Sequence, residues 1–379
     1  AQLEAAEQTI ARIYQRRVDK GKMSHDQMQQ KMDLAEFTLT YDGFDDVDIV
    51  IEGVPEKMDF KKEVFAELDK VCHPEAIFVS NTSALSIAEM GAATGRLGQV
   101  AGMHFFSPAH IMKLVEVVYS PATSQDTVDT VEQFTQELRK IPVIVKECPG
   151  FLVNRLLMVY LNEAVLAFEE GAATVAEIDE ALGRTGFGWP MGPFTLMDMI
   201  GNDVCYNVGK YLAGQYSERM ATAELFEAIF ENGRFGEKAG AGWYDYPGGG
   251  ESDVVRNLVN NLQAAGKTAT GTEFSVNRLM MPMLNEAFRC TEEEIANIND
   301  IDMACIAGLG MQVNKNGTFE RIGPLEYADE IGLDVVLAEL ERLQSEFGSR
   351  FQAADLLRQK VRAGELGKET MSGFMEYTI

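Results

Sequence analysis

Residues 100–120 have the sequence V-A-G-M-H-F-F-S-P-A-H-I-M-K-L-V-E-V-V-Y-S, and this stretch organises the first part of the chain. It contains two short apolar runs typical of buried strands. One run carries His104, and the other carries Glu116 among branched apolar residues. A carboxylate in a buried strand is costly unless a partner compensates it. We therefore expect the two strands to pair antiparallel and to bring His104 opposite Glu116.

Short apolar strands alternate with helices on both sides of this stretch. The sequence predicts helices over residues 2–21, 25–34, 59–71, 84–93 and 124–139. It predicts strands over residues 47–51, 76–80, 99–105, 113–119 and 141–146. Continuous apolar strands that alternate with helices are typical of a mostly parallel sheet covered on both faces.

The pattern changes after E-C-P-G (147–150), and residues 151–232 read as helices only, beginning with a long helix over 151–170. The run Y-P-G-G-G-E-S (246–252) predicts a linker, after which the chain reads as helical to its end. This second part is a repeat, because V-N-R-L-L-M-V-Y-L-N-E-A-V (153–165) matches V-N-R-L-M-M-P-M-L-N-E-A-F (276–288), and further blocks match in the same order. The repeat predicts two tandem copies of one helical domain that pack on each other as a pseudo-twofold pair. We expect a sheet domain at 1–148 and helical copies at 149–250 and 251–379.

The composition excludes several classes of function. The formal net charge of −26 argues against nucleic acid and against an anionic membrane surface as partners. No apolar run reaches the roughly 18 residues that span a bilayer. The five cysteines are scattered and show neither disulfide-like nor zinc-like spacing, which indicates reduced thiols in an intracellular, reducing compartment such as the bacterial cytoplasm. The sequence contains no metal-binding cluster.

His104 and Glu116 form the main candidate for catalysis. An imidazole beside a carboxylate can act as a base whose cation is steadied by the neighbouring charge. The same pair is equally consistent with a purely structural hydrogen bond, so the residues alone leave both interpretations open.

Further candidates follow the ends of predicted strands, where open sheets bind ligands. Ser83 follows the strand at 76–80, although helix capping by N-T-S (81–83) explains that stretch equally simply. Gly53 follows the strand at 47–51 and lets a ligand approach the backbone. Glu56 and Lys61 flank the next helix start, as they would in a solvated helix entry. Asn154 falls in the first turn of the long helix, where it can face the sheet domain or the solvent.

The ordered motifs S-N-T-S, G-M-H-F-F-S-P, K-L-V-E-V-V, C-P-G-F-L-V-N-R, G-W-P-M-G-P and R-F-G-E-K-A-G-A-G-W-Y-D-Y resemble those of the 3-hydroxyacyl-CoA dehydrogenase family over essentially the whole chain. The duplicated helical part resembles the dehydrogenase part of multifunctional fatty-acid β-oxidation enzymes. The resemblance implies a Rossmann-like domain, NAD as the cofactor and an acyl-CoA thioester as the substrate. It also implies an enoyl-CoA hydratase domain upstream and a thiolase partner.

The resemblance assigns roles to the candidates. His104 would be the general base in oxidation of (3S)-3-hydroxyacyl-CoA to 3-oxoacyl-CoA, and Glu116 would orient it. Ser83 and Asn154 would hold the substrate oxygen. The residues expected along NAD are Gly53, Glu56, Lys61, Ser83, Ser107 and Lys238.

Two departures from the family pattern stand out. The chain contains no G-x-G-x-x-G turn, which in the family lets the backbone approach the pyrophosphate of the cofactor. We therefore expect an N-terminally truncated Rossmann-like domain that binds NAD poorly by itself. The chain also has Ser107 where the family has asparagine. Two alternatives stay open: another Rossmann-type hydroxy-acid dehydrogenase, or a catalytically incompetent fragment that serves as a scaffold.

Overall fold

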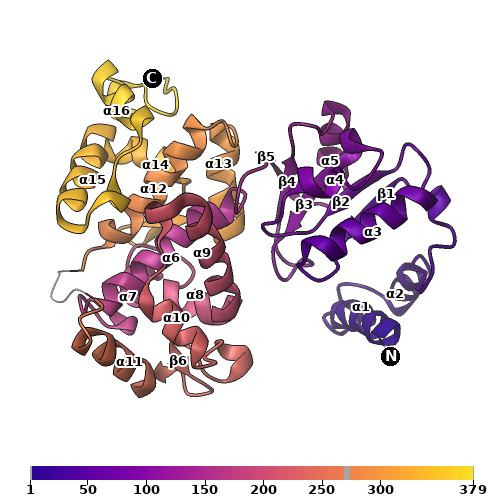
Figure 1. Ribbon diagram of the computed structural model, residues 1–379, viewed down its shortest axis with the longest axis horizontal. Coiled ribbons are helices and arrows are strands. Elements are labelled where there is room, and N and C mark those ends of the chain that lie inside the picture. The colour runs from indigo at the N-terminus through magenta and orange to yellow at the C-terminus, as the bar shows by residue number, and fades with distance from the viewer. Residues whose placement is uncertain (1, 269–273, 379) are drawn as a thin grey trace.

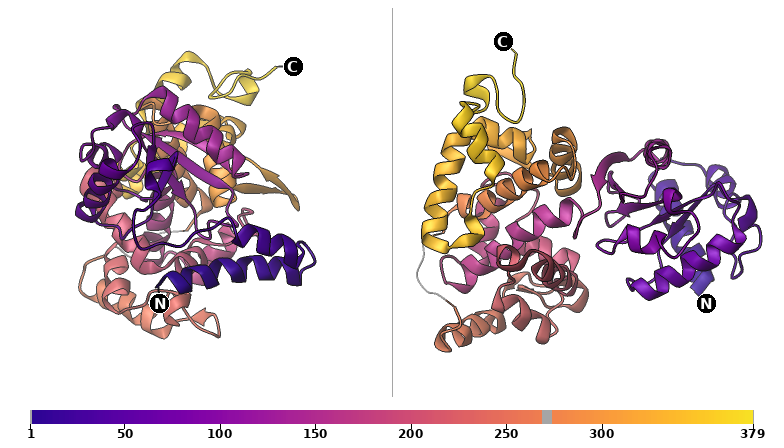
Figure 2. Two further views of the ribbon diagram at one scale, coloured as in Figure 1. Left: turned by 90° about the vertical axis from the view of Figure 1, so that its right-hand side faces the viewer. Right: turned by 45° about the horizontal axis from the view of Figure 1, so that its top comes forward.

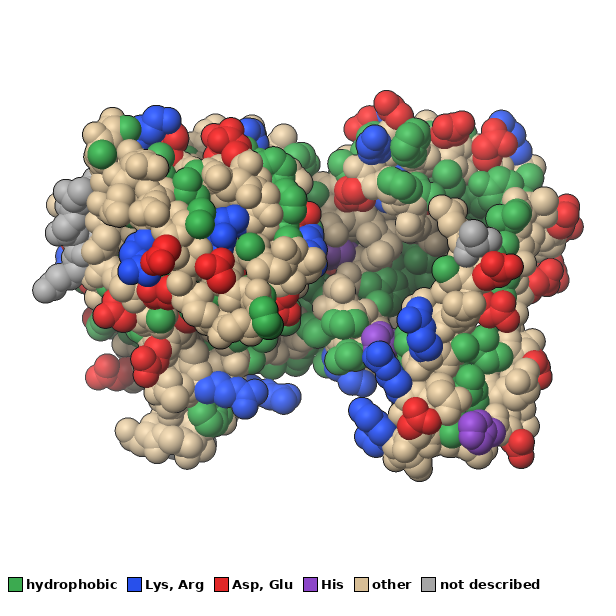
Figure 3. Space-filling view, turned by 90° about the horizontal axis from the view of Figure 1, so that it is seen from below, with side chains coloured by type: hydrophobic (Ala, Val, Ile, Leu, Met, Phe, Trp, Pro, Cys, Tyr) green, Lys and Arg blue, Asp and Glu red, His purple; other side chains and the backbone are tan. Residues whose placement is uncertain are grey.

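The computed structural model describes residues 2–268 and 274–378. The protein consists of an α/β body and a larger helical body, joined where strand β5 leads into helix α6 (Figure 1). The right-hand view of Figure 2 shows the same division, with the C-terminus at the top of the helical body. The surface is hollowed between the two bodies, and hydrophobic side chains lie in the hollow (Figure 3).

One five-stranded sheet forms the centre of the α/β body, in the order β1-β2-β3-β4-β5. Its strands are β1 (Ile49–Glu52), β2 (Ile77–Ser80), β3 (Val100–Phe105), β4 (Leu114–Tyr119) and β5 (Ile141–Lys146). Three of the four neighbouring pairs are parallel, and only β3 and β4 run antiparallel. The prediction of a mostly parallel sheet, with an antiparallel pair within residues 100–120, is therefore confirmed.

Helices cover both faces of the sheet, which explains why its strands are apolar on both sides. Phe78 packs with Phe65 of α3 (Met58–Val71) and with residues of α4 (Ile87–Gly91). Its neighbour Val79 faces the opposite side and packs with Val131 of α5 (Gln125–Glu137). All four residues of β2 are buried, as a continuous apolar run predicts. Helices α1 (Gln2–Asp19) and α2 (His25–Met32) bury no residue and lie below the sheet as an arm.

The helical body contains the same order of helices twice, as the sequence repeat predicts. Its two longest helices, α6 (Val153–Glu169) and α12 (Val276–Glu292), lie against each other at its centre. The first copy continues with α7 (Val175–Leu182), α8 (Pro193–Ile200), α9 (Asn202–Tyr216) and α10 (Glu224–Glu231). The second continues with α13 (Ile298–Ala304), α14 (Pro324–Ile331), α15 (Leu333–Phe347) and α16 (Asp355–Ala363). Helix α11 (Asp253–Ala264) lies between the copies in sequence and contacts α6 and α10.

Two short hairpins correct the prediction for this part of the chain. The expected linker at 246–252 is instead the turn and second strand of a hairpin, β6 (Tyr244–Asp245) and β7 (Gly250–Glu251), which its glycines permit. The stretch after residue 253 is not helical throughout, because β8 (Gln312–Lys315) pairs with β9 (Thr318–Arg321). Asn316 and Gly317 form the turn with φ of 56° and 89°. An Asn-Gly turn between two strands is a strong local hairpin signal, and it was missed.

Among the described residues, no helix combines the length and the apolar character that crossing a bilayer requires.

Candidate active site

His104 and Glu116 lie opposite each other on β3 and β4, as expected from the sequence. Nδ1 of His104 and Oε2 of Glu116 are 2.6 Å apart, and both side chains are almost fully buried. An ionised carboxylate can only accept a hydrogen bond, so Nδ1 of the neutral ring carries the proton and donates to Glu116. The lone pair of the ring then lies on Nε2. The rings of Phe106 and Phe151 flank the imidazole, with centroids 4.7 Å and 5.9 Å from its own.

The second oxygen of Glu116 explains how a carboxylate is tolerated inside an apolar strand. Oε1 accepts the backbone N–H groups of Leu152 and Val153, both at 2.9 Å. These amides lie at the start of α6, where unpaired N–H groups and the helix dipole favour a negative charge. Glu116 is therefore held between His104 on one side and the first turn of α6 on the other.

The same turn of α6 also reaches the loop after β2. Nδ2 of Asn154 donates to the backbone oxygen of Ser83 at 3.2 Å. Asn81, which precedes this loop, accepts the N–H of Phe105 at the end of β3 at 2.9 Å. The four predicted catalytic residues, His104, Glu116, Ser83 and Asn154, are thus linked through α6 and the edge of the sheet.

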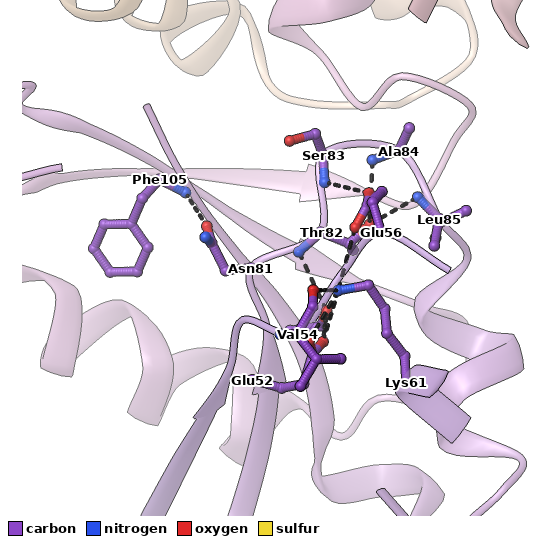
Figure 4. Close-up of polar contacts among 11 residues, drawn as sticks. Glu52, Val54, Glu56, Lys61, Asn81, Thr82, Ser83, Ala84, Leu85 and Phe105 are labelled. Atoms are coloured by element: carbon purple, nitrogen blue, oxygen red, sulfur yellow. Dashed lines mark hydrogen bonds and ion pairs between the residues drawn. The ribbon is translucent and has the colours of Figure 1, made fainter. Parts of the chain in front are cut away.

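A buried network joins the ends of β1 and β2 (Figure 4). Nζ of Lys61 is 1% exposed, donates to both oxygens of Glu52 at 2.9 and 3.0 Å, and lies 3.2 Å from Oε2 of Glu56. Glu56 accepts from the hydroxyl of Thr82 at 2.5 Å and from the N–H of Ser83 at 3.0 Å. The structure therefore brings Glu56, Lys61 and Ser83 together, and the solvated helix entry is ruled out for Lys61. The hydroxyl of Ser83 points away from this network (Figure 4).

Glu52 is the member of this network that the sequence analysis missed. It also accepts the hydroxyl of Ser80 at 2.5 Å and the N–H of Val54 at 2.6 Å. Its signal was an acidic residue that ends the apolar strand directly before Gly53.

The remaining candidates lie apart from these contacts. Gly53 is exposed, and a Cβ built on it would have no heavy atom within 4 Å, so its backbone is open to a ligand. Ser107 is exposed just beyond the end of β3. Lys238 belongs to the helical body, and its ammonium lies 2.5 Å from the carboxylate of Asp203. The structure does not bring Lys238 together with the other candidates in the described contacts.

Two nearby features do not supply catalytic groups. Burial raises the pKa of the Cys148 thiol to about 11, so this thiol stays protonated and unreactive at neutral pH. In the loop G-W-P-M-G-P, Trp189 is buried and stacks on Tyr160, and the preceding Gly188 accepts a hydrogen bond from Gln312 of the second copy at 2.7 Å. Within residues 2–268 and 274–378, no group of three or more His, Cys, Asp or Glu side chains is placed to hold a metal ion.

Comparison with known protein families agrees with this geometry. Residues 1–148 match the profile of the 3-hydroxyacyl-CoA dehydrogenase NAD-binding domain. Residues 150–246 and 274–377 match the profile of the C-terminal domain of the same enzymes. The chain belongs to the 3-hydroxyacyl-CoA dehydrogenase family. NAD is the cofactor named for the first of these domains.

Relatives in this family include subunits of larger assemblies. The fatty acid oxidation complex subunit alpha of Shewanella amazonensis is 36% identical over 358 residues, which are 92% of this chain and 49% of that protein. The subunit of the same name from Psychrobacter arcticus is 32% identical over 374 residues, or 96% of this chain and 51% of that protein. The chain therefore spans about half the length of the curated relatives it matches.

Solved structures of 3-hydroxyacyl-CoA dehydrogenases share the fold. The 3-hydroxybutyryl-CoA dehydrogenase of Escherichia coli K12 superposes with a TM-score of 0.84 at 28% identity, covering 95% of this chain and 91% of that chain. The dehydrogenase part of multifunctional enzyme 1 from C. elegans gives a TM-score of 0.61 at 26% identity, covering 94% and 81%. The family and fold expected from the motifs are thereby confirmed.

Proposed function

We propose that this dehydrogenase-family chain catalyses the NAD-dependent oxidation of (3S)-3-hydroxyacyl-CoA to 3-oxoacyl-CoA. The observation that carries the proposal is the buried contact between His104 and Glu116, which leaves Nε2 of the imidazole for a substrate. A base in a largely water-excluded site, with its cation balanced by a neighbouring carboxylate, suits removal of a hydroxyl proton.

In this mechanism Nε2 of His104 accepts the proton of the C3 hydroxyl while the C3–H bond breaks and the C3 carbonyl forms. The imidazolium that results is balanced by Glu116, whose charge is fixed by the amides of Leu152 and Val153. Asn154 and Ser83 hold the substrate oxygen. The contact between them places both residues beside the sheet edge that carries His104 and Glu116. In the reverse direction the imidazolium returns the proton.

Several residues at this sheet edge suit a nicotinamide cofactor, although the chain lacks the G-x-G-x-x-G turn expected to hold its pyrophosphate. Gly53 leaves its backbone open, and the Glu52–Lys61–Glu56 network fixes the adjoining strand ends in a polar surface. When bound, NAD+ supplies the acceptor for the hydride from C3. The residues proposed to line the cofactor are Gly53, Glu56, Ser83, Ser107 and Lys238. Lys61 is 1% exposed and is proposed to act from beneath them by fixing Glu52 and Glu56, and Lys238 pairs with Asp203.

A lysine as the base, in another Rossmann-type hydroxy-acid dehydrogenase, has less support in this geometry. Lys61 lies at the sheet edge, but its ammonium donates to Glu52 and sits beside Glu56. A lysine engaged by two carboxylates is poorly placed to accept a proton. In His104, Nδ1 contacts Glu116, and Nε2 remains to accept a proton.

Replacement of the base tests the proposal. His104→Ala should lower kcat for 3-hydroxyacyl-CoA on the order of 10²–10⁴-fold. The formation of NADH measures this turnover. The matched control is His73→Ala, because His73 lies beyond the end of α3 and its ring accepts a local N–H from Glu75. A scaffold would show no turnover in the unmodified protein, and a different base would leave His104→Ala as active as the control.

We propose further that the second helical copy takes the place of a partner subunit, as an intramolecular pseudo-dimer. It reaches the sheet directly, since the N–H of Ile144 in β5 donates to Asp300 at 3.1 Å and the N–H of Lys146 donates to Ile295 at 2.7 Å. This arrangement supports a division into an NAD-binding domain at 1–148 and helical domains at 149–250 and 251–379.

The partners and location are proposed from the relatives and the cysteines. The relatives are named as alpha subunits of a fatty acid oxidation complex. We infer that this chain is the dehydrogenase part of such an assembly, with a hydratase domain and a thiolase as its partners. All five cysteines are free thiols, which favours a reducing compartment such as the bacterial cytoplasm.

A further inference from the structure

Two buried arginines occupy equivalent places in the two helical copies. Arg155 lies in the first turn of α6, and Arg278 lies in the first turn of α12. Each side chain is at most 1% exposed, and each reaches across to carboxylates of the other copy. The two long helices are therefore tied together at both ends by charge pairs that leave little freedom, because breaking a buried pair costs several kcal/mol.

Arg155 contacts two carboxylates of the second copy and a tyrosine of the first. Its Nε donates to Glu286 at 2.5 Å, and its Nη1 and Nη2 donate to the two oxygens of Glu293 at 2.7 and 2.8 Å. The guanidinium also lies over the ring of Tyr216, 4.8 Å from the centroid, and the hydroxyl of Tyr216 donates to Pro149 at 3.2 Å, just before α6. The second copy thus fixes the position at which α6 begins.

The contacts of Arg278 are of the same kind. Its Nε donates to Glu163 at 2.7 Å, and its Nη2 lies 2.8 Å from Glu170. Glu163 of α6 and Glu170, which directly follows α6, correspond in sequence to Glu286 and Glu293 of the second copy.

Only one of the two arginines has the candidate active site next to it. Directly before Arg155, the amides of Leu152 and Val153 hold Glu116, and Asn154 contacts Ser83. The residue equivalent to Asn154 in the second copy is Asn277, which is exposed. The same arginine–carboxylate arrangement therefore occurs once beside the sheet and once away from it.

We propose that Arg155, held by Glu286 and Glu293 of the second helical copy, is a positioning residue for catalysis: it fixes the first turn of α6, which places Glu116 against His104 and Asn154 against the substrate. The proposal rests on the proposed dehydrogenase function. It makes the second copy a working part of the active site, although that copy contributes no group to the reacting atoms. Displacement of a catalytic group by about 1 Å can cost about 10²-fold in rate, so loss of this anchor should be visible in turnover.

The first test compares Arg155→Lys with Arg278→Lys. Lysine keeps the charge at both places but cannot form the forked contact with two carboxylates. Both variants should lose thermal stability to a similar extent. Arg155→Lys should lower kcat about tenfold while KM for NAD stays nearly unchanged, whereas Arg278→Lys should keep kcat within about twofold of the unmodified protein. Equal effects of the two substitutions on kcat would overturn the proposal.

A milder pair covers the case in which the arginine variants do not fold. Glu293→Gln weakens the anchor of Arg155 from the second copy, and Glu170→Gln does the same to Arg278. The side chain of Glu293 is 42% exposed, so its replacement leaves the core packing intact. Glu293→Gln should lower kcat more than Glu170→Gln does, and the opposite order contradicts the proposal.

A spectroscopic arm separates this proposal from the proposed function. The chain has four histidines, so the NMR spectrum of a histidine-labelled sample contains few ring signals. The signal that disappears in His104→Ala is the one that belongs to His104. Arg155→Lys should move the His104 ring signal and Arg278→Lys should not. If the unmodified protein shows no NAD-dependent turnover, the function is wrong, but the ring signal still decides the positioning. A His104 signal that moves in neither variant, or equally in both, overturns it.

Discussion

Asp179 and Asp302 occupy equivalent places in the two helical copies, but they receive different hydrogen bonds. Asp179 accepts the N–H groups of Phe194 and Thr195, the hydroxyl of Thr195 and the hydroxyl of Tyr244. Asp302 accepts the N–H groups of Leu325 and Glu326 at the start of α14. The second copy thus keeps the two backbone contacts. Glu326 stands where the first copy has Thr195, so the hydroxyl donor at that position is lost.

This difference predicts a pH-dependent stability. Burial, followed by the nearby charges of Glu326 and Asp329, raises the pKa of Asp302 to about 7, although the two backbone N–H groups act to lower it. The folded protein then binds a proton that the unfolded chain releases near pH 4, so the contribution of Asp302 to stability is full below pH 4 and is lost as the pH rises through 7. The loss is on the order of 4 kcal/mol at most.

Asp302→Asn should therefore flatten the dependence of the free energy of unfolding on pH between 4 and 7. Urea unfolding at several pH values measures this dependence, with the unmodified protein as the reference. An identical slope in both proteins would show that Asp302 stays ionised over the whole range.

Gly242 should be intolerant of any side chain. A Cβ there would lie 1.9 Å from Oδ1 of Asp198, and this buried carboxylate cannot move without losing the N–H groups of Trp243 and Tyr244. Gly242→Ala should cost roughly 3 kcal/mol of stability. Gly248→Ala, where a Cβ meets nothing within 4 Å, is the control and should cost less than about 0.5 kcal/mol. Thermal unfolding of the two variants decides the matter, and equal midpoints would refute the packing argument.

Lys61 should matter for stability more than its neighbour Lys62. Lys61→Met leaves Glu52 and Glu56 without the ammonium between them, at a cost of about 3–5 kcal/mol. Lys62 pairs with Glu89 at the surface, so Lys62→Met should cost less than about 1 kcal/mol. Chemical unfolding of both variants provides the comparison, and a cost for Lys61→Met as small as that for Lys62→Met would mean that the network is not closed in solution.

The thiols should resist alkylation in the folded protein. Burial raises the pKa of Cys148 to about 11 and that of Cys205 to about 12, and the other three cysteines are buried. Iodoacetamide at neutral pH should label none of them rapidly, while all five should react in urea. Fast labelling of Cys148 without denaturant would show that the start of α6 opens.

The central pair could be predicted from the sequence because a charge in an apolar strand requires a partner nearby. His104 lies in the strand that directly precedes the strand of Glu116, so the pairing of β3 with β4 could be predicted from residues close together in the sequence. The second partner of Glu116 was not predictable in the same way, since it consists of backbone amides at the start of α6, over thirty residues later. Every residue except proline has a backbone N–H donor, so the residue types in the sequence do not show which N–H groups bind a carboxylate.

Other features were missed for identifiable physical reasons. Glu52 was overlooked because its ion pair with Lys61 forms only when α3 folds back over the sheet edge. The hairpin of β8 and β9 carries the signal Asn316-Gly317, but the described residues between α7 and α8 form no counterpart of it, so the repeat did not predict it. The role of the second copy at Arg155 depends on contacts more than 130 residues apart, which no local pattern encodes.

A double-mutant cycle of kcat with His104→Ala and Glu116→Gln measures whether Glu116 acts through His104. If Glu116 acts only through His104, the double variant should be no slower than His104→Ala alone, within about twofold. If the losses of the two single variants instead multiply in the double variant, the two residues act independently, and the account of an imidazole base oriented by this carboxylate is wrong.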